Sequence, residues 1–261
     1  MFKAVFIDID NTLTDTKSHL VPESAAHAIQ KARRAGVLVF AATGRNTLSV
    51  TESKTIDHIT FDGYVGMNGS ICHFGKEEPF YSLPLDPSDV EAAFTSCHEM
   101  GVAMAVSTLR DIYITGMSEN VHRIERIVDI DTPGFLPQGF DYKKEAVYSL
   151  MPYADRDGQK RIASRLRHSV TARWNDWAFD IIPAGGGKHV GMQKMMEKFA
   201  LKREEVLAMG DGENDITMLE YAGLGVAMAH SAETVKKSAG FIAPEPEPVR
   251  AVFEKYGIIR R

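Results

Sequence analysis

The sequence predicts an α/β protein whose core is a doubly wound parallel sheet with an inserted α+β domain. Short apolar runs alternate with amphipathic helical stretches at both ends of the chain, a pattern typical of parallel strands joined by helices. Residues 83–183 differ, because prolines interrupt a mixture of helix and strand signals. The alternation resumes only after this segment, so we expect one domain, residues 1–82 and 184–261, to contain the other.

The first part of the outer domain is expected to form a strand, a helix and two more strands, at residues 3–7, 22–35, 37–42 and 64–67. The helix has Pro22 in its first turn and Gly36 directly after its end, residues that favour a helix start and stop. The second part is expected to form helices at 188–200, 215–222 and 233–239, a last helix ending at residue 256, and strands at 206–209, 224–227 and 241–243.

The inserted domain, residues 83–183, is expected to contain strands at 102–106, 112–116, 146–151 and 177–182 and helices at 89–100 and 157–168. The stretch WNDW at 174–177 is expected to turn between two of these strands. Its two tryptophans either contact a bound ligand or fill the core of this domain.

Bulk composition excludes several classes of protein. The chain has 261 residues, of which 44% are hydrophobic and 25% charged, enough to bury a sizeable core. A net charge of −5 gives no general attraction to nucleic acid or an anionic membrane. The first residues match neither a signal peptide nor a membrane span, so a cytoplasmic location is expected. Cys72 and Cys97 have no metal-ligand spacing and are expected to be reduced packing residues.

Four stretches place short polar groups beside apolar runs: DIDNT at 8–12, ATGR at 42–45, GGGK at 185–188 and GDGEND at 210–215. Because the carboxyl ends of parallel strands share one edge of the sheet, we expect these stretches to meet there. Their aspartates would repel one another, by about 4 kcal/mol for two charges about 4 Å apart at an effective dielectric near 20. A hard divalent cation such as Mg²⁺ relieves that repulsion. The acids are Asp8, Asp10, Asp211 and Asp215.

The same stretches contain groups that bind anions: the Thr43 hydroxyl, the Gly44 amide, the Lys188 ammonium and the Asn214 amide. Carboxylates beside a metal, a lysine and amide donors suit a phosphoryl group, whose transfer depends on positioning and charge neutralisation. An aspartate at a strand end can attack phosphorus and form an aspartyl-phosphate, and we assign this role to Asp8. An acid two residues further on can protonate the leaving oxygen and then deprotonate water, which is the role expected for Asp10.

In this order, the four stretches resemble the motifs of the haloacid dehalogenase superfamily of phosphohydrolases, and MNG at 67–69 with the late insertion resembles its Cof-type branch. The resemblance implies a Rossmann-like core, a cap domain inserted between the second and third motifs, and Mg²⁺-dependent hydrolysis of phosphate monoesters, often sugar phosphates.

Residue by residue, the resemblance implies that the metal ligands are Asp8, Asp211 and the backbone carbonyl of Asp10. It implies that Thr43 and Lys188 bind phosphate, with Asn214 beside them, and that Asp215 orients Lys188. Asn11 stands where the family usually has glycine, and asparagine tolerates the left-handed backbone conformation better than most residues. Asn68 is a candidate substrate contact. Arg45 either binds substrate or pairs with an acid.

Other phosphate and metal motifs fit the sequence poorly. A calcium loop of the EF-hand type needs Asp or Asn at Thr12 and glycine at Leu13. A phosphate loop of nucleotide triphosphatases needs glycine at Ile182 and Ser or Thr at His189. Met192, Met195, Met196 and Phe199 follow helical spacing and are expected in the core.

The sequence therefore predicts a cytoplasmic Mg²⁺-dependent phosphatase of small phosphorylated metabolites, with hexose phosphates as the leading class. A phosphomutase with the same phospho-aspartate chemistry and a non-catalytic sugar-phosphate sensor are the alternatives. The expected partner is a small phosphate monoester, with no nucleic acid and no membrane. A monomer and a weak dimer are both compatible with the sequence.

Overall fold

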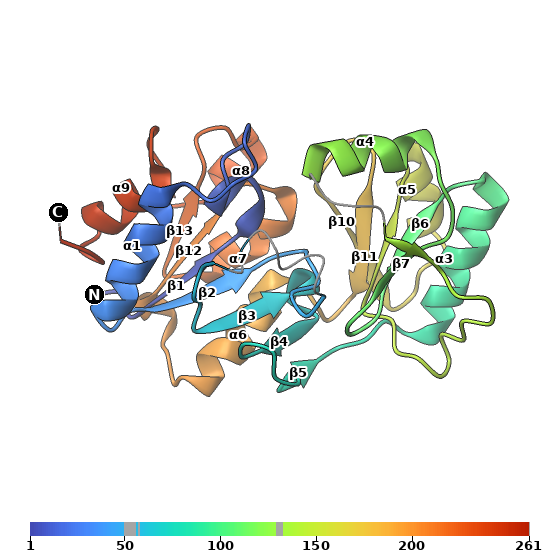
Figure 1. Cartoon of the computed structure of the whole chain (residues 1–261), viewed down its shortest axis with the longest axis horizontal. Helices are drawn as coiled ribbons and strands as arrows, with labels where there is room; N and C mark the ends of the chain where they lie inside the picture. The colour runs from blue at the N-terminus through green and yellow to red at the C-terminus, as the bar shows by residue number, and fades with distance from the viewer. Residues whose placement is uncertain (50–55, 57, 129–132, 261) are drawn as a thin grey trace.

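Two β-sheets lie along the long axis of the molecule, each with its own helices (Figure 1). The computed structural model describes residues 1–49, 56, 58–128 and 133–260. The strand order is β14-β13-β12-β1-β2-β3-β4-β5 in an eight-stranded sheet and β10-β11-β9-β6-β7-β8 in a six-stranded sheet. Both ends of the chain belong to the first sheet and its helices, and the middle of the chain forms the second (Figure 1). We call these two parts the core and the cap.

The core sheet is parallel from β14 to β3 and antiparallel from β3 to β5. Its strands are β1 (Ala4–Ile7), β2 (Leu38–Ala42), β3 (Gly63–Gly66), β4 (Ile71–His73), β5 (Tyr81–Ser82), β12 (Val206–Gly210), β13 (Leu224–Ala227) and β14 (Phe241–Ile242). β1 lies between β12 and β2, and all of its residues are buried. A strand covered on both faces needs a continuous apolar sequence, which AVFI provides. The fold class expected from the sequence is confirmed.

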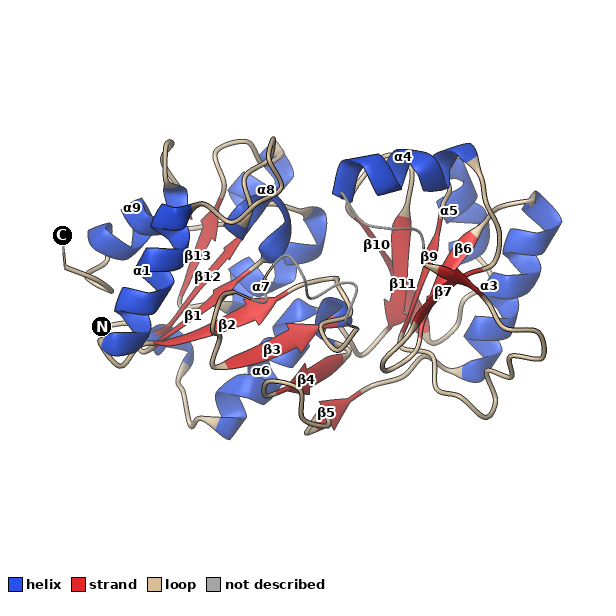
Figure 2. Ribbon diagram, in the orientation of Figure 1, coloured by secondary structure: helices blue, strands red, loops and turns tan. Residues whose placement is uncertain are grey.

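Helices cover both faces of the core sheet (Figure 2). On one face, α1 (Glu23–Arg34) and α9 (Pro248–Lys255) pack on the strand side chains that include Val5 and Ile7. On the other face, α6 (Lys188–Lys198), α7 (Ile216–Tyr221) and α8 (Glu233–Lys237) pack against Phe6 and Phe40. Met192, Met195 and Met196 of α6 are buried in this second cluster, as expected.

The cap sheet is antiparallel except between β7 and β8. Its strands are β6 (Met104–Ser107), β7 (Ile112–Ile114), β8 (Gly134–Phe135), β9 (Ser149–Pro152), β10 (Ser169–Arg173) and β11 (Phe179–Pro183). Helices α3 (Pro87–Met100) and α5 (Arg156–Ala163) cover one face, and α4 (Glu119–Val128) packs on the other. β6 alternates accordingly, because Met104 and Val106 face α3 while Ala105 faces α4.

Three elements of the cap were not predicted from the sequence, and one predicted helix is longer than the observed one. α4, β8 and β10 were not expected, and the helix expected at 157–168 ends at Ala163. β10 is an edge strand whose residues are mostly half-buried or exposed, so it lacks the apolar run that makes a strand evident. The turn expected at 174–177 does lie between β10 and β11.

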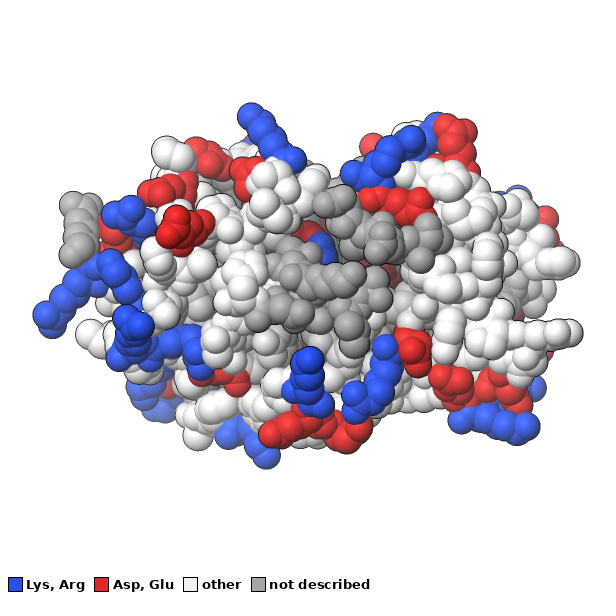
Figure 3. All heavy atoms as spheres, in the orientation of Figure 1, with Lys and Arg blue, Asp and Glu red and all other residues white. Residues whose placement is uncertain are grey.

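Cationic and anionic side chains are interspersed over the face drawn in Figure 3. Cys72 and Cys97 are buried and free, as expected. Within the described ranges, none of the helices is long and apolar enough to cross a membrane.

Candidate active site

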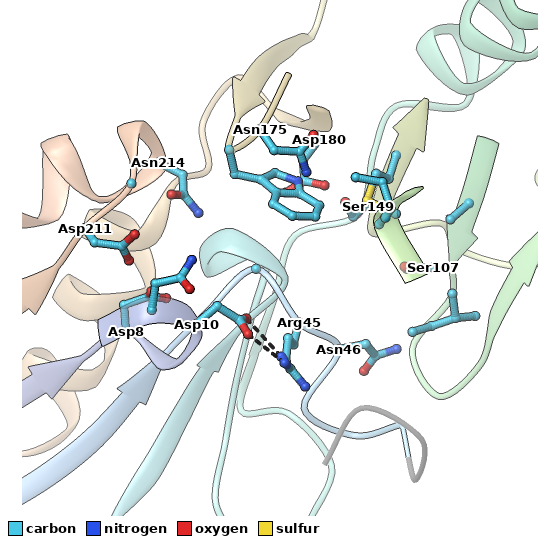
Figure 4. A pocket seen from close by; sticks show the side chains of 18 of the residues that line it. Asp8, Asp10, Arg45, Asn46, Ser107, Ser149, Asn175, Asp180, Asp211 and Asn214 are labelled. Atoms are coloured by element: carbon cyan, nitrogen blue, oxygen red, sulfur yellow. Dashed lines mark hydrogen bonds and ion pairs between the residues drawn. The ribbon is translucent and has the colours of Figure 1, made fainter. Parts of the chain in front are cut away.

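The two opening aspartates lie where β1 ends, in the middle of the core sheet. Asp8 directly follows the strand and donates its backbone N–H to Met209 O of β12 at 3.0 Å. A tight turn over Ile9–Leu13 then reverses the chain, and Asn11 adopts a φ of 58° there. This is the left-handed conformation that asparagine tolerates. The turn leaves Asp8 and Asp10 at the carboxyl edge of the sheet (Figure 4).

Lys188 connects two of the expected motifs. It is the first residue of α6, and its side chain is fully buried. Its Nζ donates to Asp8 Oδ1 at 2.5 Å and to Asp215 Oδ1 at 2.6 Å. Asp8 and Asp215 lie 180 and 27 residues from Lys188 in the sequence, and both contact its ammonium group. A buried cation needs such anionic partners, because desolvation alone would disfavour its charge.

Asp215 fixes the loop that contains Asp211. Its Oδ2 accepts the backbone N–H groups of Asp211 at 3.0 Å and Gly212 at 2.9 Å, while its Oδ1 accepts from Lys188. Both carboxylate oxygens thus have donors within the protein. Asp215 is suited to position Lys188 and the loop rather than to hold a ligand of its own.

Burial and the pairing of opposite charges together set the protonation of this cluster. Burial raises the pKa of Asp8 well above 3.8, and the neighbouring carboxylates raise it further while Lys188 opposes them. Burial likewise raises the pKa of Asp215, again against Lys188. For Lys188, burial lowers the pKa but the two carboxylates outweigh it, so the pKa lies above its usual value. The excess of carboxylates over cations favours an additional positive charge at this place.

The geometry fits a divalent cation. Oxygen atoms from Asp8, Asp211 and Asp215 all lie within 4.8 Å of one another. Because Asp215 is engaged by Lys188 and two amides, Asp8 and Asp211 are the members with acceptor capacity left for a metal. Asp211 Oδ1 also accepts from Thr12 Oγ1 at 2.9 Å, which fixes the carboxylate.

His230 is a neighbour of Asp211 that the sequence predictions missed. Its Nε2 lies 3.7 Å from Asp211 Oδ2. The contact with Asp211 raises the pKa of His230 above its usual value. His230 follows β13 in the loop before α8, and a lone histidine outside any spaced motif gave no signal of this proximity.

Arg45 pairs with Asp10 through two parallel hydrogen bonds. Its Nε lies 2.9 Å from Oδ2 and its Nη2 lies 2.6 Å from Oδ1 (Figure 4). Two-pronged pairing of this kind fixes both the position and the plane of the carboxylate. Of the two roles considered for Arg45, the structure shows the pairing with an acid.

Thr43, Asn68 and Asn214 form a connected group at the end of β2. Thr43 is fully buried; its hydroxyl accepts from Arg45 N at 3.1 Å, and its backbone carbonyl accepts from Asn68 N at 2.9 Å. Asn214 Nδ2 donates to Asn68 Oδ1 at 2.9 Å. An ideal Cβ on Gly44 would lie 3.2 Å from Asn68 Nδ2, so this group packs closely on the ATGR backbone.

Gly69 brings the MNG and GGGK segments together. Its φ is +87°, and a Cβ at this position would lie only 2.1 Å from Gly187 O. Any other residue would therefore separate the two backbones or strain the turn. Glycine at Gly69 allows α6, and with it Lys188, to begin beside the end of β3.

Asp180 of cap strand β11 is the main residue that the sequence predictions missed. It is 7% exposed, and its Oδ2 accepts from Asn68 Nδ2 at 2.6 Å. Burial raises the pKa of Asp180 to about 7, against hydrogen bonds from Asn68 and Trp174. An acid inside the apolar run FDII was a signal that could have identified it.

The pKa of Asp180 predicts a dependence of stability on pH. Between the ordinary value of 3.8 and about 7, the folded protein retains a proton that the unfolded chain has lost, so the free energy of unfolding falls as the pH rises. Asp180→Asn removes this titration. From about pH 5 to about pH 8, we expect the free energy of unfolding to fall less in the variant than in the parent. The difference between the two decreases should be up to about 3 kcal/mol. Urea unfolding at both pH values measures the difference, and an unchanged pH dependence would contradict the assignment.

A cavity of about 260 Å³ lies between the core motifs and the cap. Core residues on its wall include Asp8, Asp10, Gly44, Arg45 and Asp211, and cap residues form the opposite side (Figure 4). The core and cap also touch beside it, because Asn46 Nδ2 donates to Thr108 O at 3.1 Å.

The two tryptophans of the predicted turn have different positions. Trp174 lines the cavity. Trp177 is 37% exposed and lies under the Arg123 guanidinium, 4.3 Å from the ring centroid. Ligand contact is therefore open to Trp174 alone of the pair.

A doubly wound sheet with paired aspartates beneath an inserted cap defines the class of capped phosphoryl-transfer enzymes. The sequence pattern of the haloacid dehalogenase-like hydrolases matches residues 5–254, and the chain belongs to this family. The resemblance to its Cof-type branch and the prediction of a phosphatase are confirmed.

Individual relatives span nearly the whole chain. The chain is 28% identical over 248 residues to the 5-amino-6-(5-phospho-D-ribitylamino)uracil phosphatase YitU of Bacillus subtilis, covering 90% of this chain and 89% of that protein. A solved subclass IIB sugar phosphatase superimposes with a TM-score of 0.88 at 27% identity, covering 98% of this chain and 100% of the other. A second solved structure is described as showing a trigonal-bipyramidal intermediate in a phosphoryl-transfer superfamily. It superimposes with a TM-score of 0.90 at 27% sequence identity, covering 99% of this chain and 100% of the other.

Proposed function

We propose that this protein is a Mg²⁺-dependent phosphatase that hydrolyses small phosphorylated metabolites, sugar phosphates above all, through an aspartyl-phosphate on Asp8. The main observation in support is the position of Lys188, whose Nζ lies within hydrogen-bond distance of Asp8 and Asp215. It keeps a strand-end carboxylate in place beside a cavity that can admit a substrate. The sugar phosphatase and the ribitylaminouracil phosphatase among the relatives support a polyhydroxylated leaving group.

Asp8 acts as the nucleophile in this proposal. Lys188 binds its Oδ1, so Oδ2 is the oxygen left to attack phosphorus. The new O–P bond forms as the bond from phosphorus to the leaving oxygen breaks, and the leaving group takes a proton from Asp10. Asp10 then removes a proton from water, which attacks phosphorus, releases inorganic phosphate and restores Asp8.

The ion pair between Arg45 and Asp10 affects which direction Asp10 can donate its proton in this cycle. Both oxygens of Asp10 accept from Arg45 in the structure, whereas a carboxylic acid has to direct its O–H toward the leaving oxygen. A proton on the side of Asp10 that Arg45 occupies would open at least one of the two hydrogen bonds. The phosphoryl oxygens, which are strong acceptors, are suited to draw the guanidinium away.

Asp10→Asn is expected to affect substrates with poor leaving groups most. A nitrophenolate leaves without a proton, but a sugar alkoxide needs one. We expect a loss of about 10³-fold in kcat for glucose 6-phosphate and a loss smaller by about tenfold or more for 4-nitrophenyl phosphate. Steady-state phosphate release from both compounds measures this. Equal losses would contradict the acid role, and Asp157→Asn, an exposed acid paired with Lys160, is the control.

Asp8 and Asp211, with the backbone carbonyl of Asp10, would hold the Mg²⁺ ion. The ion would neutralise charge that develops on the phosphoryl oxygens. Thr12 and His230 position Asp211 for this task through its two carboxylate oxygens.

Metal removal tests the proposed function. With excess EDTA we expect release of inorganic phosphate to fall by about 10³-fold or more, and added Mg²⁺ to restore it. Mg²⁺ alone is expected to raise the melting temperature, since it relieves the repulsion among the carboxylates. Activity that survives EDTA would overturn the metal requirement. Isomerised sugar phosphate in place of free phosphate would identify a mutase.

We further propose that residues 83–183 close as a cap over the bound substrate and keep bulk water from the aspartyl-phosphate while it forms. The contacts from Asn46 to Thr108 and from Asn68 to Asp180 support such closure. A cytoplasmic location completes the proposal, and the buried free thiols of Cys72 and Cys97 support it.

A further inference from the structure

The cap side of the cavity combines an apolar wall with a few uncharged polar groups. Ile112, Ile124 and Met151 line it with hydrocarbon. Ser107 and Ser149 contribute hydroxyl groups from the ends of neighbouring strands (Figure 4). A leaving group bound here would place one face on hydrocarbon and one edge beside hydroxyls.

The charges on the cavity wall are mainly negative. Within the described part of the chain, the lining residues include the carboxylates of Asp8, Asp10, Asp180 and Asp211, and Arg45 is the single arginine, with no lysine. Arg45 is already paired with Asp10. Nothing in the described cap lining would neutralise a second anionic group on a substrate. Asp180 would repel such a group at a pH above its pKa of about 7.

Asp180 also has acceptor capacity toward the cavity. A carboxylate offers about four acceptor positions, and the donors to Asp180 are Asn68 and Trp174. Its Oδ2 would lie 3.5 Å from a Cβ placed on Gly44, so the carboxylate lies at the phosphate-motif end of the cap wall. A hydroxyl or amine close to the ester oxygen of the substrate would find it within reach.

We propose that this cavity selects phosphate monoesters whose leaving group is free of further negative charge and donates a hydroxyl or amine hydrogen to Asp180. This selectivity rests on the proposed function. It excludes bisphosphates and phosphorylated carboxylic acids as good substrates, while neutral polyol phosphates and amino-bearing phosphates fit.

A matched pair of substrates tests the proposal. Sorbitol 6-phosphate and 6-phosphogluconate share a six-carbon hydroxylated chain and differ at the far end, which is a hydroxymethyl group in one and a carboxylate in the other. At about pH 8, where Asp180 is ionised, we expect kcat/KM to be about tenfold or more higher for sorbitol 6-phosphate. Equal values, or a preference for 6-phosphogluconate, would overturn the proposal.

Two variants assign the selectivity to the cap wall. Asp180→Asn keeps an oxygen acceptor but removes the charge. We expect the ratio of kcat/KM for sorbitol 6-phosphate to kcat/KM for 6-phosphogluconate to fall by about threefold or more. Met151→Lys places a cation on the half-buried wall. We expect this variant to lower the same ratio further, in favour of 6-phosphogluconate. The control is Asp176→Asn, an exposed acid in the turn before β11 that is outside the cavity lining; its preference should equal that of the parent. An unchanged ratio in both Asp180→Asn and Met151→Lys would overturn the proposal.

Binding separates this inference from the proposed function. Calorimetry of both phosphates with the full-length Asp8→Asn protein and Mg²⁺ reports selectivity without turnover. A preference of about tenfold in Kd for sorbitol 6-phosphate supports the inference even if no substrate is hydrolysed, whereas absent turnover of every phosphate overturns the phosphatase proposal. Equal binding, or binding of neither compound, overturns the inference.

Discussion

Asp8→Asn is expected to lower the turnover of 4-nitrophenyl phosphate by about 10⁴-fold or more. An amide oxygen is a far poorer nucleophile than a carboxylate, so the aspartyl-phosphate cannot form. The substitution changes neither shape nor volume appreciably. Phosphate release in the presence of Mg²⁺ measures the loss, with Asp157→Asn as a control that should retain parental activity.

The folded state of Asp8→Asn should remain intact, which separates a chemical defect from a structural one. Lys188 keeps Asp215 as a partner at 2.6 Å, and burial makes the charged form of Asp8 unfavourable without a metal. The metal-free variant is therefore expected to melt no lower than the parent. An active variant would refute the role of Asp8 as nucleophile, and an unfolded one would refute this account of the cluster.

Lys188→Met is expected to have the largest effect on stability. It leaves Asp8 and Asp215 buried beside each other without a cation, although methionine retains most of the volume. Removing one partner of a buried ion pair costs about 3–5 kcal/mol, and we expect that loss in the metal-free protein near neutral pH. Activity should also fall below detection, since the substitution disturbs the proposed nucleophile, Asp8, and removes a proposed phosphate-binding group.

The pH dependence distinguishes this cause from simple loss of packing. The pKa values of Asp8 and Asp215 are raised by burial even with Lys188 present, and they would rise further without it. On acidification these carboxylates take up protons in the folded state, so the deficit of Lys188→Met should shrink as the pH falls. Urea unfolding at neutral and mildly acidic pH checks this, and a deficit independent of pH would argue against it.

Lys194→Met is a matched control on the same helix. Lys194 lies on the surface and pairs with Glu197 at 3.0 Å, so its removal leaves no buried charge. We expect little change in either stability or activity. A loss comparable to that of Lys188→Met would mean that any substitution in α6 disturbs the site.

Local sequence determined the core sheet and most of the candidate site. β1, β2 and β12 are continuous apolar runs, as a strand buried on both faces requires. The polar residues directly after them then have to lie at one edge of the sheet, because parallel strands share their direction. That rule predicted the meeting of Asp8 and Asp211, and the helix expected from residue 188 does begin at Lys188.

The elements of the cap were less evident, and the reason is physical. β10 lies at an edge and is half-exposed, so its pattern is mixed. The role proposed for Asp180 depends on a contact with Asn68, which is 112 residues away. No local periodicity encodes such a pair.

The sequence by itself determined the family, the nucleophile candidate and the edge of the sheet where chemistry can occur, since strand direction and apolar runs are local properties. Only the tertiary structure decided that Arg45 binds Asp10, that Asp180 reaches the core motifs, and that the cavity wall is mainly apolar and acidic. Those features arise where the cap meets the core, and the free energy of such contacts depends on distances between segments that are remote in the chain.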